Sequence, residues 1–213
     1  LEVRGSADAI IWDAWRPVQQ SEDDQRLAPR TSDLLFGEGV ALQYRATFQA
    51  DPGGTPPVLE NLRLVCIDSR SGPSAAQLAA TCELTPTEGP TVISRDAWGA
   101  DESIMTWPPE CRPIRAIVLH HTATEDRGID PAAMLRAIYY YQAAVREWGD
   151  IGYNYLIDPL GNIYEGRAGG PGVVGAHAQR FEWGSVGVAL IGDYGQQDPS
   201  SAMLDSLTEF LAW

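Results

Sequence analysis

The chain has 213 residues, 44% of them hydrophobic, which is enough to bury one large core or two small ones. No stretch approaches the roughly twenty apolar residues that a membrane-spanning helix needs, so the sequence predicts no membrane span. The formal net charge of −14 argues against nucleic acid and anionic lipid as partners, because an acidic surface repels both.

Residues 1–83 are predicted to form a small antiparallel β-sandwich. Apolar residues alternate or cluster at strand length, with polar turns between them, in the ranges 1–4, 10–18, 40–48 and 62–68. Repeated short runs of this kind are typical of two packed antiparallel sheets. Trp12 and Trp15 could bind sugar, but in so small a domain we expect them in the core.

Residues 84–91 are predicted to be a linker. The run is rich in Pro, Thr and Gly, and it can continue neither a helix nor a central strand. The three cysteines leave two interpretations open. Cys66 and Cys82 could form a disulfide in an oxidising compartment and leave Cys111 unpaired, or all three could be free, buried thiols.

Residues 92–213 are predicted to form an α/β domain with a mixed β-sheet flanked by helices. The apolar run from residue 115 to 121 predicts a strand that is covered on both faces. Asp130 and Pro131 are suited to the N-cap and first position of a helix, and apolar residues then recur at helical spacing as far as Trp148.

The rest of this domain continues the alternation of strands and helices. The ranges 153–157 and 162–165 predict a hairpin, and 185–191 predicts a buried strand. A last helix begins near residue 200, and its predicted apolar face includes Leu204, Leu207 and Leu211. No helix stop signal occurs before Trp213, so we expect the C-terminus of the domain to be incomplete.

Four short segments contain all three histidines of the chain. They read IVLHHTA at residues 117–123, DIGYNY at 150–155, YEGR at 164–167 and GAHA at 175–178. In this order they resemble the family of peptidoglycan recognition proteins and type-2 N-acetylmuramoyl-L-alanine amidases. Its catalytic members are zinc enzymes that cleave the amide bond between N-acetylmuramic acid and the L-alanine of the stem peptide of bacterial peptidoglycan. The resemblance runs from about residue 92 to the end of the chain, and it implies the amidase/peptidoglycan-recognition fold.

The resemblance assigns roles to the motif residues. It makes His120 a zinc ligand and places the other zinc ligands beyond Trp213, in a region that this sequence does not contain. Tyr153 matches a catalytic tyrosine whose neutral phenol donates to the oxyanion. Because successive side chains of a strand point to opposite faces, His121 is expected to point away from His120.

Asn154, Arg167 and His177 are the expected substrate-binding residues. Arg167 and His177 match positions that line the peptidoglycan groove, where a guanidinium suits the carboxylates of the stem peptide. Glu165 could act as a general base on chemical grounds alone, and we rank it below the other candidates. Glu182 stands where many relatives have asparagine, and an acid there would alter what the groove binds.

The sequence therefore predicts a parent protein that is an exported zinc amidase, secreted or associated with the cell wall, with bacterial peptidoglycan as its partner. The 213-residue chain alone is expected to bind zinc weakly or not at all and to be inactive, since a catalytic zinc site needs three protein ligands. The alternative is a non-catalytic peptidoglycan-binding module. A third reading is an α/β interaction domain without any role in muropeptide binding.

Overall fold

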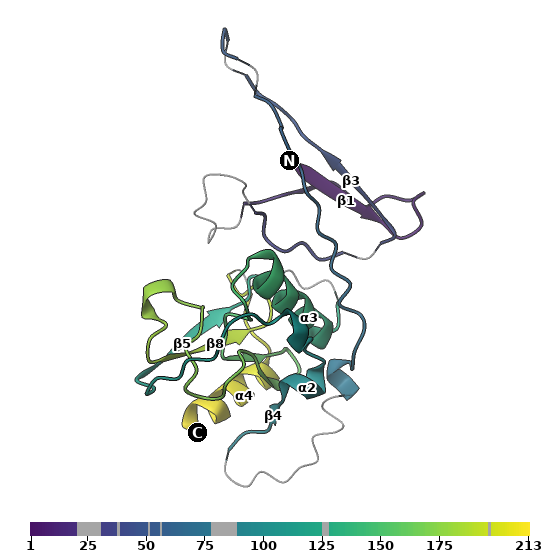
Figure 1. Ribbon diagram of the computed structural model, residues 1–213. Helices are drawn as coiled ribbons and strands as arrows, with labels where there is room; N and C mark the ends of the chain where they lie inside the picture. Colours follow the sequence, from purple (N-terminus) through teal and green to yellow (C-terminus); the bar gives the residue numbers. More distant parts are fainter. Residues whose placement is uncertain are drawn as a thin grey trace. The chain divides into compact units, whose positions relative to one another are not determined.

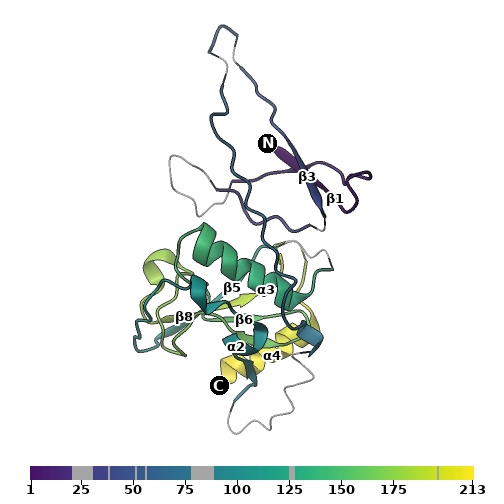
Figure 2. The same ribbon diagram turned by 45° about the vertical axis from the view of Figure 1, so that its right-hand side comes forward.

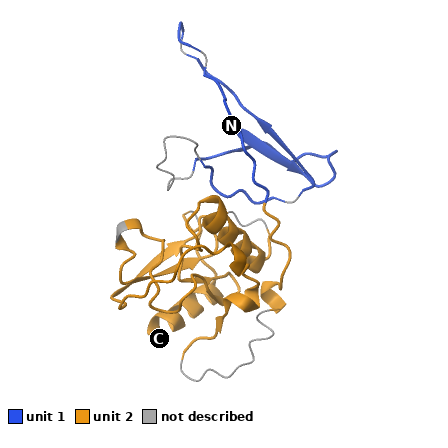
Figure 3. Ribbon diagram, viewed as in Figure 1, with its two compact units in different colours: residues 1–66 blue, residues 67–213 orange. Residues whose placement is uncertain are grey.

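The computed structural model divides the chain into two compact units, Leu1–Cys66 and Ile67–Trp213 (Figure 3). The residues that it describes are 1–20, 31–37, 39–50, 52–55, 57–77, 89–124, 128–195 and 197–213. None of the described helices is long and apolar enough to cross a membrane.

The first unit contains a three-stranded antiparallel sheet in the order β2-β1-β3 (Figure 1). Its strands are β1 (Glu2–Ser6), β2 (Arg16–Pro17) and β3 (Ala41–Arg45). The predicted strand at residues 62–68 is not formed. Within the described part of this unit there is one sheet, so the predicted sandwich of two sheets is not confirmed.

Trp12 and Trp15 are half-buried and lie against arginines, so their predicted place in the core is wrong. The guanidinium carbon of Arg4 is 5.2 Å from the ring centre of Trp12 and 4.5 Å from that of Trp15. Arg45 lies 4.5 Å from the Trp15 ring centre and pairs with Glu2 at 2.6 Å. Cation–π stacking therefore holds these rings, while the small core of the unit includes Val3 and Phe36.

The second unit contains a five-stranded mixed sheet in the order β4-β7-β6-β8-β5 (Figures 1 and 2). β6 and β7 pair antiparallel across the predicted hairpin, and every other neighbouring pair is parallel. The strands are β4 (Val92–Ile93), β5 (Ala116–His121), β6 (Tyr155–Ile157), β7 (Ile163–Glu165) and β8 (Ser185–Leu190). The predicted mixed sheet with flanking helices is thus confirmed.

Two longer helices, α3 (Pro131–Tyr140) and α4 (Ser201–Ala212), cover opposite faces of this sheet (Figures 1 and 2). The short elements of this unit are α2 (Arg95–Trp98), the 3₁₀ turns η1 (Glu102–Ile104) and η3 (Gln179–Phe181), and the π-helical turn η2 (Tyr141–Val145). Asp130 caps α3 as predicted, because its carboxylate accepts from the backbone N–H groups of Ala132 and Ala133. The helix does not continue to Trp148, since the chain passes into η2 and then turns at Glu147 with φ 61°.

The segment that follows the first unit packs on α3. The guanidinium of Arg136 donates to the carbonyls of Ser69 and Pro73, and the N–H of Ala75 donates to the carboxylate of Asp130. These bonds lie within the second compact unit, although the sequence placed residues 67–83 in the first domain. The domain boundary at 84–91 remains a prediction, because residues 84–88 lie outside the described part of the chain.

Strand β5 differs from its predicted environment. It lies at the edge of the sheet, paired only with β8 among the described residues, and Ile117 and Leu119 are 44% and 52% exposed. The prediction of a strand covered on both faces is therefore wrong for β5. It is right for β8, whose six residues are all buried.

The thiols of Cys66 and Cys111 are free and exposed, so the interpretation as buried thiols is wrong for these two residues. Cys82 lies outside the described part of the chain.

Helix α4 uses a different apolar face from the predicted one. Met203, Leu207 and Phe210 are buried against β6 and β8, whereas Leu204 and Leu211 are 43% and 48% exposed. Only Leu207 belongs to both faces.

This register of α4 predicts different costs for two leucines. Leu207→Ala should lower the free energy of unfolding by about 2 to 4 kcal/mol, because it opens a cavity in the core. Leu204→Ala, on the exposed side of the same helix, should change it by less than about 0.5 kcal/mol. Urea denaturation of both variants measures the difference, and equal costs would contradict the assigned face.

Candidate functional site

The pairing of β5 with β8 assigns the two adjacent histidines to different faces of the sheet. His121 stands opposite Leu190, and Leu190 belongs to the core under α4. His120 stands opposite Ala189, so it shares the other face with Gly187. His121 is thereby turned away, as expected, and its Nδ1 accepts from the backbone N–H of Tyr194 at 3.0 Å.

Three of the predicted site residues meet on the face opposite α4. His120 Nε2 and His177 Nδ1 are 3.0 Å apart, and their ring centres are separated by 5.1 Å. The ring of Tyr153 lies 5.7 Å from that of His120, tilted by 50°. The loop after β7 and the turn before β6 thus bring His177 and Tyr153 to the C-terminal half of β5.

The imidazole of His177 lies in a seat made by two glycines. A Cβ atom added to Gly187 or to Gly175 would overlap the ring, so neither position has room for a side chain. Gly187 is in the middle of β8, and its small size lets the ring approach the sheet. Ser185 Oγ lies 3.4 Å from His177 Nε2, at the far side of the ring from His120.

Asn154 fixes the strands under this seat. Its Nδ2 donates to the carbonyl of Val173 at 2.7 Å, and its Oδ1 accepts from the N–H of Gly187 at 2.8 Å. The residue is 2% exposed. In this buried position Asn154 holds β8 to the loop that leads to His177, which argues against the predicted direct contact with substrate.

A π-helical turn contributes a further anchor that the sequence did not reveal. Gln142, in η2, is buried, and its Oε1 accepts from the N–H of Gly152 at 2.8 Å. The carbonyl of Gly152 in turn accepts from the N–H of Ala176 at 2.9 Å. Gln142 therefore anchors the residue before Tyr153, and a backbone hydrogen bond connects that residue to the one before His177. π-Turns of this kind often occur at functional sites.

Arg167 lies beneath the site rather than at its surface. It is 1% exposed, its Nη1 donates to the carbonyl of Ile151 at 3.0 Å, and its guanidinium carbon lies 5.0 Å from the ring centre of Trp107. Its Nε is buried and has no hydrogen-bond partner among the residues that the structure describes. The burial lowers the pKa of Arg167, and the carboxylates of Asp150 and Glu182 oppose that shift.

Both histidines of the pair favour the neutral form. Burial lowers the pKa of His177 to about 4, and the neighbouring His120 and Arg167 act in the same direction. Burial also lowers the pKa of His120, with a smaller effect of His121. Near neutral pH the two imidazoles therefore form a neutral pair, one ring donating and the other accepting.

The donor set is partly suited to zinc. A neutral imidazole such as His120 is a common zinc ligand, but a site needs three or four donors. Among the described residues no group of three His, Cys, Asp or Glu side chains is arranged to hold a metal ion. Two other residues with suitable donor atoms have partners elsewhere: Glu165 accepts from the N–H of Arg95 at 3.4 Å, and the thiol of Cys111 lies beside the carbonyl of Gly169.

The family model described as N-acetylmuramoyl-L-alanine amidase matches residues 110–213. Peptidoglycan-recognition protein 2 of Holotrichia diomphalia is 35% identical over 127 residues, which cover 57% of this chain and 65% of that protein. The N-acetylmuramoyl-L-alanine amidase of Sus scrofa is 30% identical over 190 residues, 84% of this chain and 31% of that protein. The chain thus spans less than two thirds of the length of both relatives.

A solved structure also resembles the second unit. It is the peptidoglycan recognition protein LE in complex with tracheal cytotoxin, a monomeric diaminopimelic acid-type peptidoglycan. The identity is 34%, the TM-score is 0.51, and the match covers 57% of this chain and 71% of that one. The similarity seen in the sequence is therefore also a similarity of fold.

The glycine seat predicts that Gly187→Ala displaces the ring of His177. The added methyl group overlaps the imidazole, so the ring must leave His120, while β8 retains its backbone pairing. Histidine ring resonances in an NMR spectrum should shift for His120 and His177 and stay unchanged for His121. Gly37→Ala, in the first unit, is the control, since its φ is not in the left-handed region and a Cβ there would meet only the end of the flexible Arg16 side chain, at 3.3 Å. An unchanged His177 resonance in Gly187→Ala would contradict the described seat.

The depressed pKa of His177 predicts a pH dependence of stability. As the pH falls below the ordinary value of 6.5, the unfolded chain takes up this proton first, and the folded chain follows at about 4. The stability that the neutral ring contributes is therefore present above pH 6.5 and is lost between about 6.5 and 4. In metal-free protein, NMR titration should give a His177 midpoint of about 4. His177→Gln should weaken the loss in urea denaturation, and a midpoint near 6.5 in the native protein would refute the assignment.

Proposed function

Because the chain belongs to the family of peptidoglycan recognition proteins and N-acetylmuramoyl-L-alanine amidases, we propose that its parent protein is a zinc-dependent amidase of bacterial peptidoglycan. The bond cleaved is the amide between N-acetylmuramic acid and L-alanine. The observation that carries the proposal is the approach of His120 and Tyr153, whose rings lie 5.7 Å apart on one face of the sheet. A metal ligand beside a phenol is the pair of groups that this hydrolysis needs.

His120 is the proposed zinc ligand within this chain, and the resemblance to the family puts the other ligands beyond Trp213. Bound zinc would supply an activated water and would polarise the scissile carbonyl. The described residues do not complete the ligand set. The roles below are therefore confined to residues of this chain.

Tyr153 acts as a neutral hydrogen-bond donor. The tyrosine is half-buried between His120 and the turn that Gln142 anchors at Gly152. A fixed phenol of this kind gains strength when negative charge develops on the carbonyl oxygen in the transition state. The neutral form of His177 suits the same task of binding an amide without adding a buried charge.

The substrate side of the proposal rests on charge. The buried guanidinium of Arg167 lies beneath the face that carries His120 and Tyr153, and the part of its positive charge that Asp150 does not offset suits the carboxylates of a stem peptide. Glu182 attracts the same guanidinium and offsets a further part of that charge. We therefore expect Glu182 to reduce the preference for carboxylate-rich stem peptides relative to amidated ones.

A second candidate function is peptidoglycan binding without hydrolysis. One observation favours it. The imidazole nitrogens of His120 and His177 are hydrogen-bonded to each other, and among the described residues no third side chain joins them to form a metal site. In either case the partner is bacterial peptidoglycan, which requires that the protein be exported to the cell wall or beyond. Secretion is accordingly part of the proposal.

The proposed role of the phenol predicts the effect of Tyr153→Phe in the parent protein, extended beyond Trp213. Turnover should fall by about 10² to 10³-fold, because one donor to the oxyanion is lost. Zinc content, measured by metal analysis, should stay unchanged, because the phenol is not a ligand. Tyr140→Phe, on an exposed tyrosine of α3, is the matched control and should keep full activity. Loss of zinc in Tyr153→Phe would instead assign the phenol to the metal.

Ligand counting predicts how the 213-residue chain behaves by itself. It should bind zinc weakly and release little or no stem peptide from purified peptidoglycan. The extended parent should bind zinc tightly and release the stem peptide. Release is measured with and without a chelator on both proteins. Zinc-dependent release by the shorter chain would mean that another residue, such as His177 or Cys111, completes the site. Binding of peptidoglycan by the parent without any release would favour the second candidate function.

A further inference from the structure

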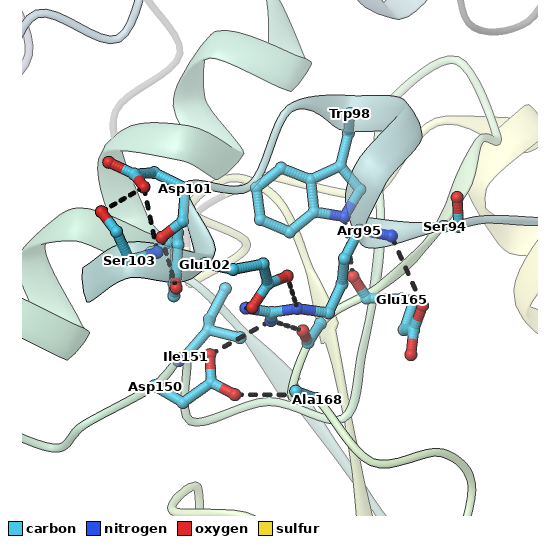
Figure 4. A network of polar contacts seen from close by, with 12 residues as sticks. Ser94, Arg95, Trp98, Asp101, Glu102, Ser103, Asp150, Ile151, Glu165 and Ala168 are labelled. Atoms are coloured by element: carbon cyan, nitrogen blue, oxygen red, sulfur yellow. Dashed lines mark hydrogen bonds and ion pairs between the residues drawn. The ribbon is translucent and has the colours of Figure 1, made fainter. Parts of the chain in front are cut away.

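A buried ionic cluster joins the two segments that carry Tyr153 and Arg167 (Figure 4). Asp150, at its centre, is 1% exposed. Its carboxylate accepts from the N–H of Ile151 at 2.7 Å, from the N–H of Ala168 at 2.9 Å and from Nη1 of Arg95 at 3.1 Å. Ile151 lies two residues before Tyr153, and Ala168 directly follows Arg167, so one carboxylate is hydrogen-bonded to both segments.

Arg95 provides the counter-charge to Asp150 and forms a further hydrogen bond to the segment of Arg167. It comes from α2, is 5% exposed, and forms a bidentate pair with Glu102 at 2.7 and 3.1 Å. Its Nη1 also donates to the carbonyl of Gly166, which precedes Arg167. The rings of Tyr139 and Trp98 flank the guanidinium, at 4.9 and 5.7 Å from its central carbon. The guanidinium of Arg95 is therefore held by hydrogen bonds to three residues and lies close to two aromatic rings.

The two segments are also bonded directly to each other. The N–H of Arg167 donates to the carbonyl of Tyr153 at 2.8 Å, and the Arg167 side chain donates to the carbonyl of Ile151 at 3.0 Å. The guanidinium of Arg167 thus donates to a neutral carbonyl, that of Ile151, which cannot balance its positive charge. Burial opposes the charge of Arg95, but the bond to Glu102 and the charge of Asp150 outweigh it and raise the pKa of Arg95. Asp150 pairs directly with Arg95, and its charge also acts on Arg167, where it opposes the lowering of the pKa by burial.

We propose that Asp150 is a positioning residue, which with Arg95 sets the place of the Tyr153 phenol and of Arg167 relative to each other. The significance of that placement for muropeptide binding rests on the proposed function. The mechanism is electrostatic as well as structural, because an uncharged isostere would keep the shape of the cluster and leave two buried cations without their common anion. In Asp150→Asn the amide would have one acceptor oxygen in place of two, so it could accept from the N–H of Ile151 or from that of Ala168 but would present its own N–H₂ group to the other.

The test compares Asp150→Asn with Asp158→Asn. Asp158 is a matched control, because it is 0% exposed and also accepts from two backbone N–H groups, those of Leu160 and Asn162, but in the β6–β7 turn. Both variants should lose stability in thermal denaturation. In protein labelled with ¹³C-tyrosine, the ring resonance of Tyr153, assigned through Tyr153→Phe, should shift or broaden in Asp150→Asn and stay in place in Asp158→Asn.

A binding measurement follows on the same proteins. Isothermal titration with N-acetylmuramoyl-L-alanyl-D-isoglutamine should give an affinity about tenfold lower for Asp150→Asn, and within about twofold of the native protein for Asp158→Asn. An unchanged Tyr153 resonance in Asp150→Asn, or an equal change in both variants, would overturn the positioning role. If the native protein does not bind this muropeptide, the proposed function fails while the Tyr153 resonance still decides the positioning role.

A milder variant serves if Asp150→Asn does not fold. Glu102 is half exposed, so Glu102→Gln leaves the fold intact and removes one of the two anions that hold Arg95. The Tyr153 resonance should then move in the same direction, by a smaller amount. A folded Glu102→Gln protein with an unchanged Tyr153 ring would count against the proposal in the same way.

Discussion

The register between β5 and β8 is the constraint on which the candidate site depends. Side chains alternate along a strand, so a shift by one residue would exchange His120 and His121 between the two faces of the sheet. The pairing of His120 with Ala189 and of His121 with Leu190 fixes the choice, because Leu190 must be buried under α4. Core packing on one face therefore determines which histidine meets His177 and Tyr153 on the other.

The site combines neutral histidines above with paired charges below. His120 and His177 are driven towards the neutral form by burial, which suits ligation and hydrogen bonding. Beneath them, Arg95 and Arg167 are almost entirely buried and are balanced by Asp150 with Glu102. Buried ion pairs seldom add much net stability, but removing one partner is costly. Such a cluster is better understood as a device that holds loops in one arrangement than as a source of stability.

Glycine and a π-turn allow these parts to approach closely. Gly187 lets the imidazole of His177 rest on the sheet, and η2 directs Gln142 to the backbone of Gly152. Both are local departures from good strand or helix formation, and both occur where the chain must bring a functional side chain to a fixed place. In the first unit, by contrast, Arg4 and Arg45 stack on tryptophan and so hold the short sheet.

The sequence by itself determined the elements whose signals are local. Asp130 and Pro131 predicted the start of α3, the turn at Asp158 to Gly161 predicted the β6–β7 hairpin, and alternation along β5 predicted the separation of His120 from His121. These follow from interactions between residues near in the chain. The four motifs, through their resemblance to a family, also placed His120, Tyr153 and His177 among the predicted site residues.

Only the tertiary structure decided what depends on distant partners. The apolar run of β5 reads as a buried strand, but its exposure follows from its place at the sheet edge. Arg167 and Asn154 have the polar character of ligand-binding residues, yet packing buries both. The anion that joins Arg95 to the loop of Arg167 lies 55 residues from Arg95 in the chain, and no periodicity or local motif encodes such a contact. Burial and long-range ion pairing are properties of the assembled fold, because they depend on which surfaces meet after the chain has closed.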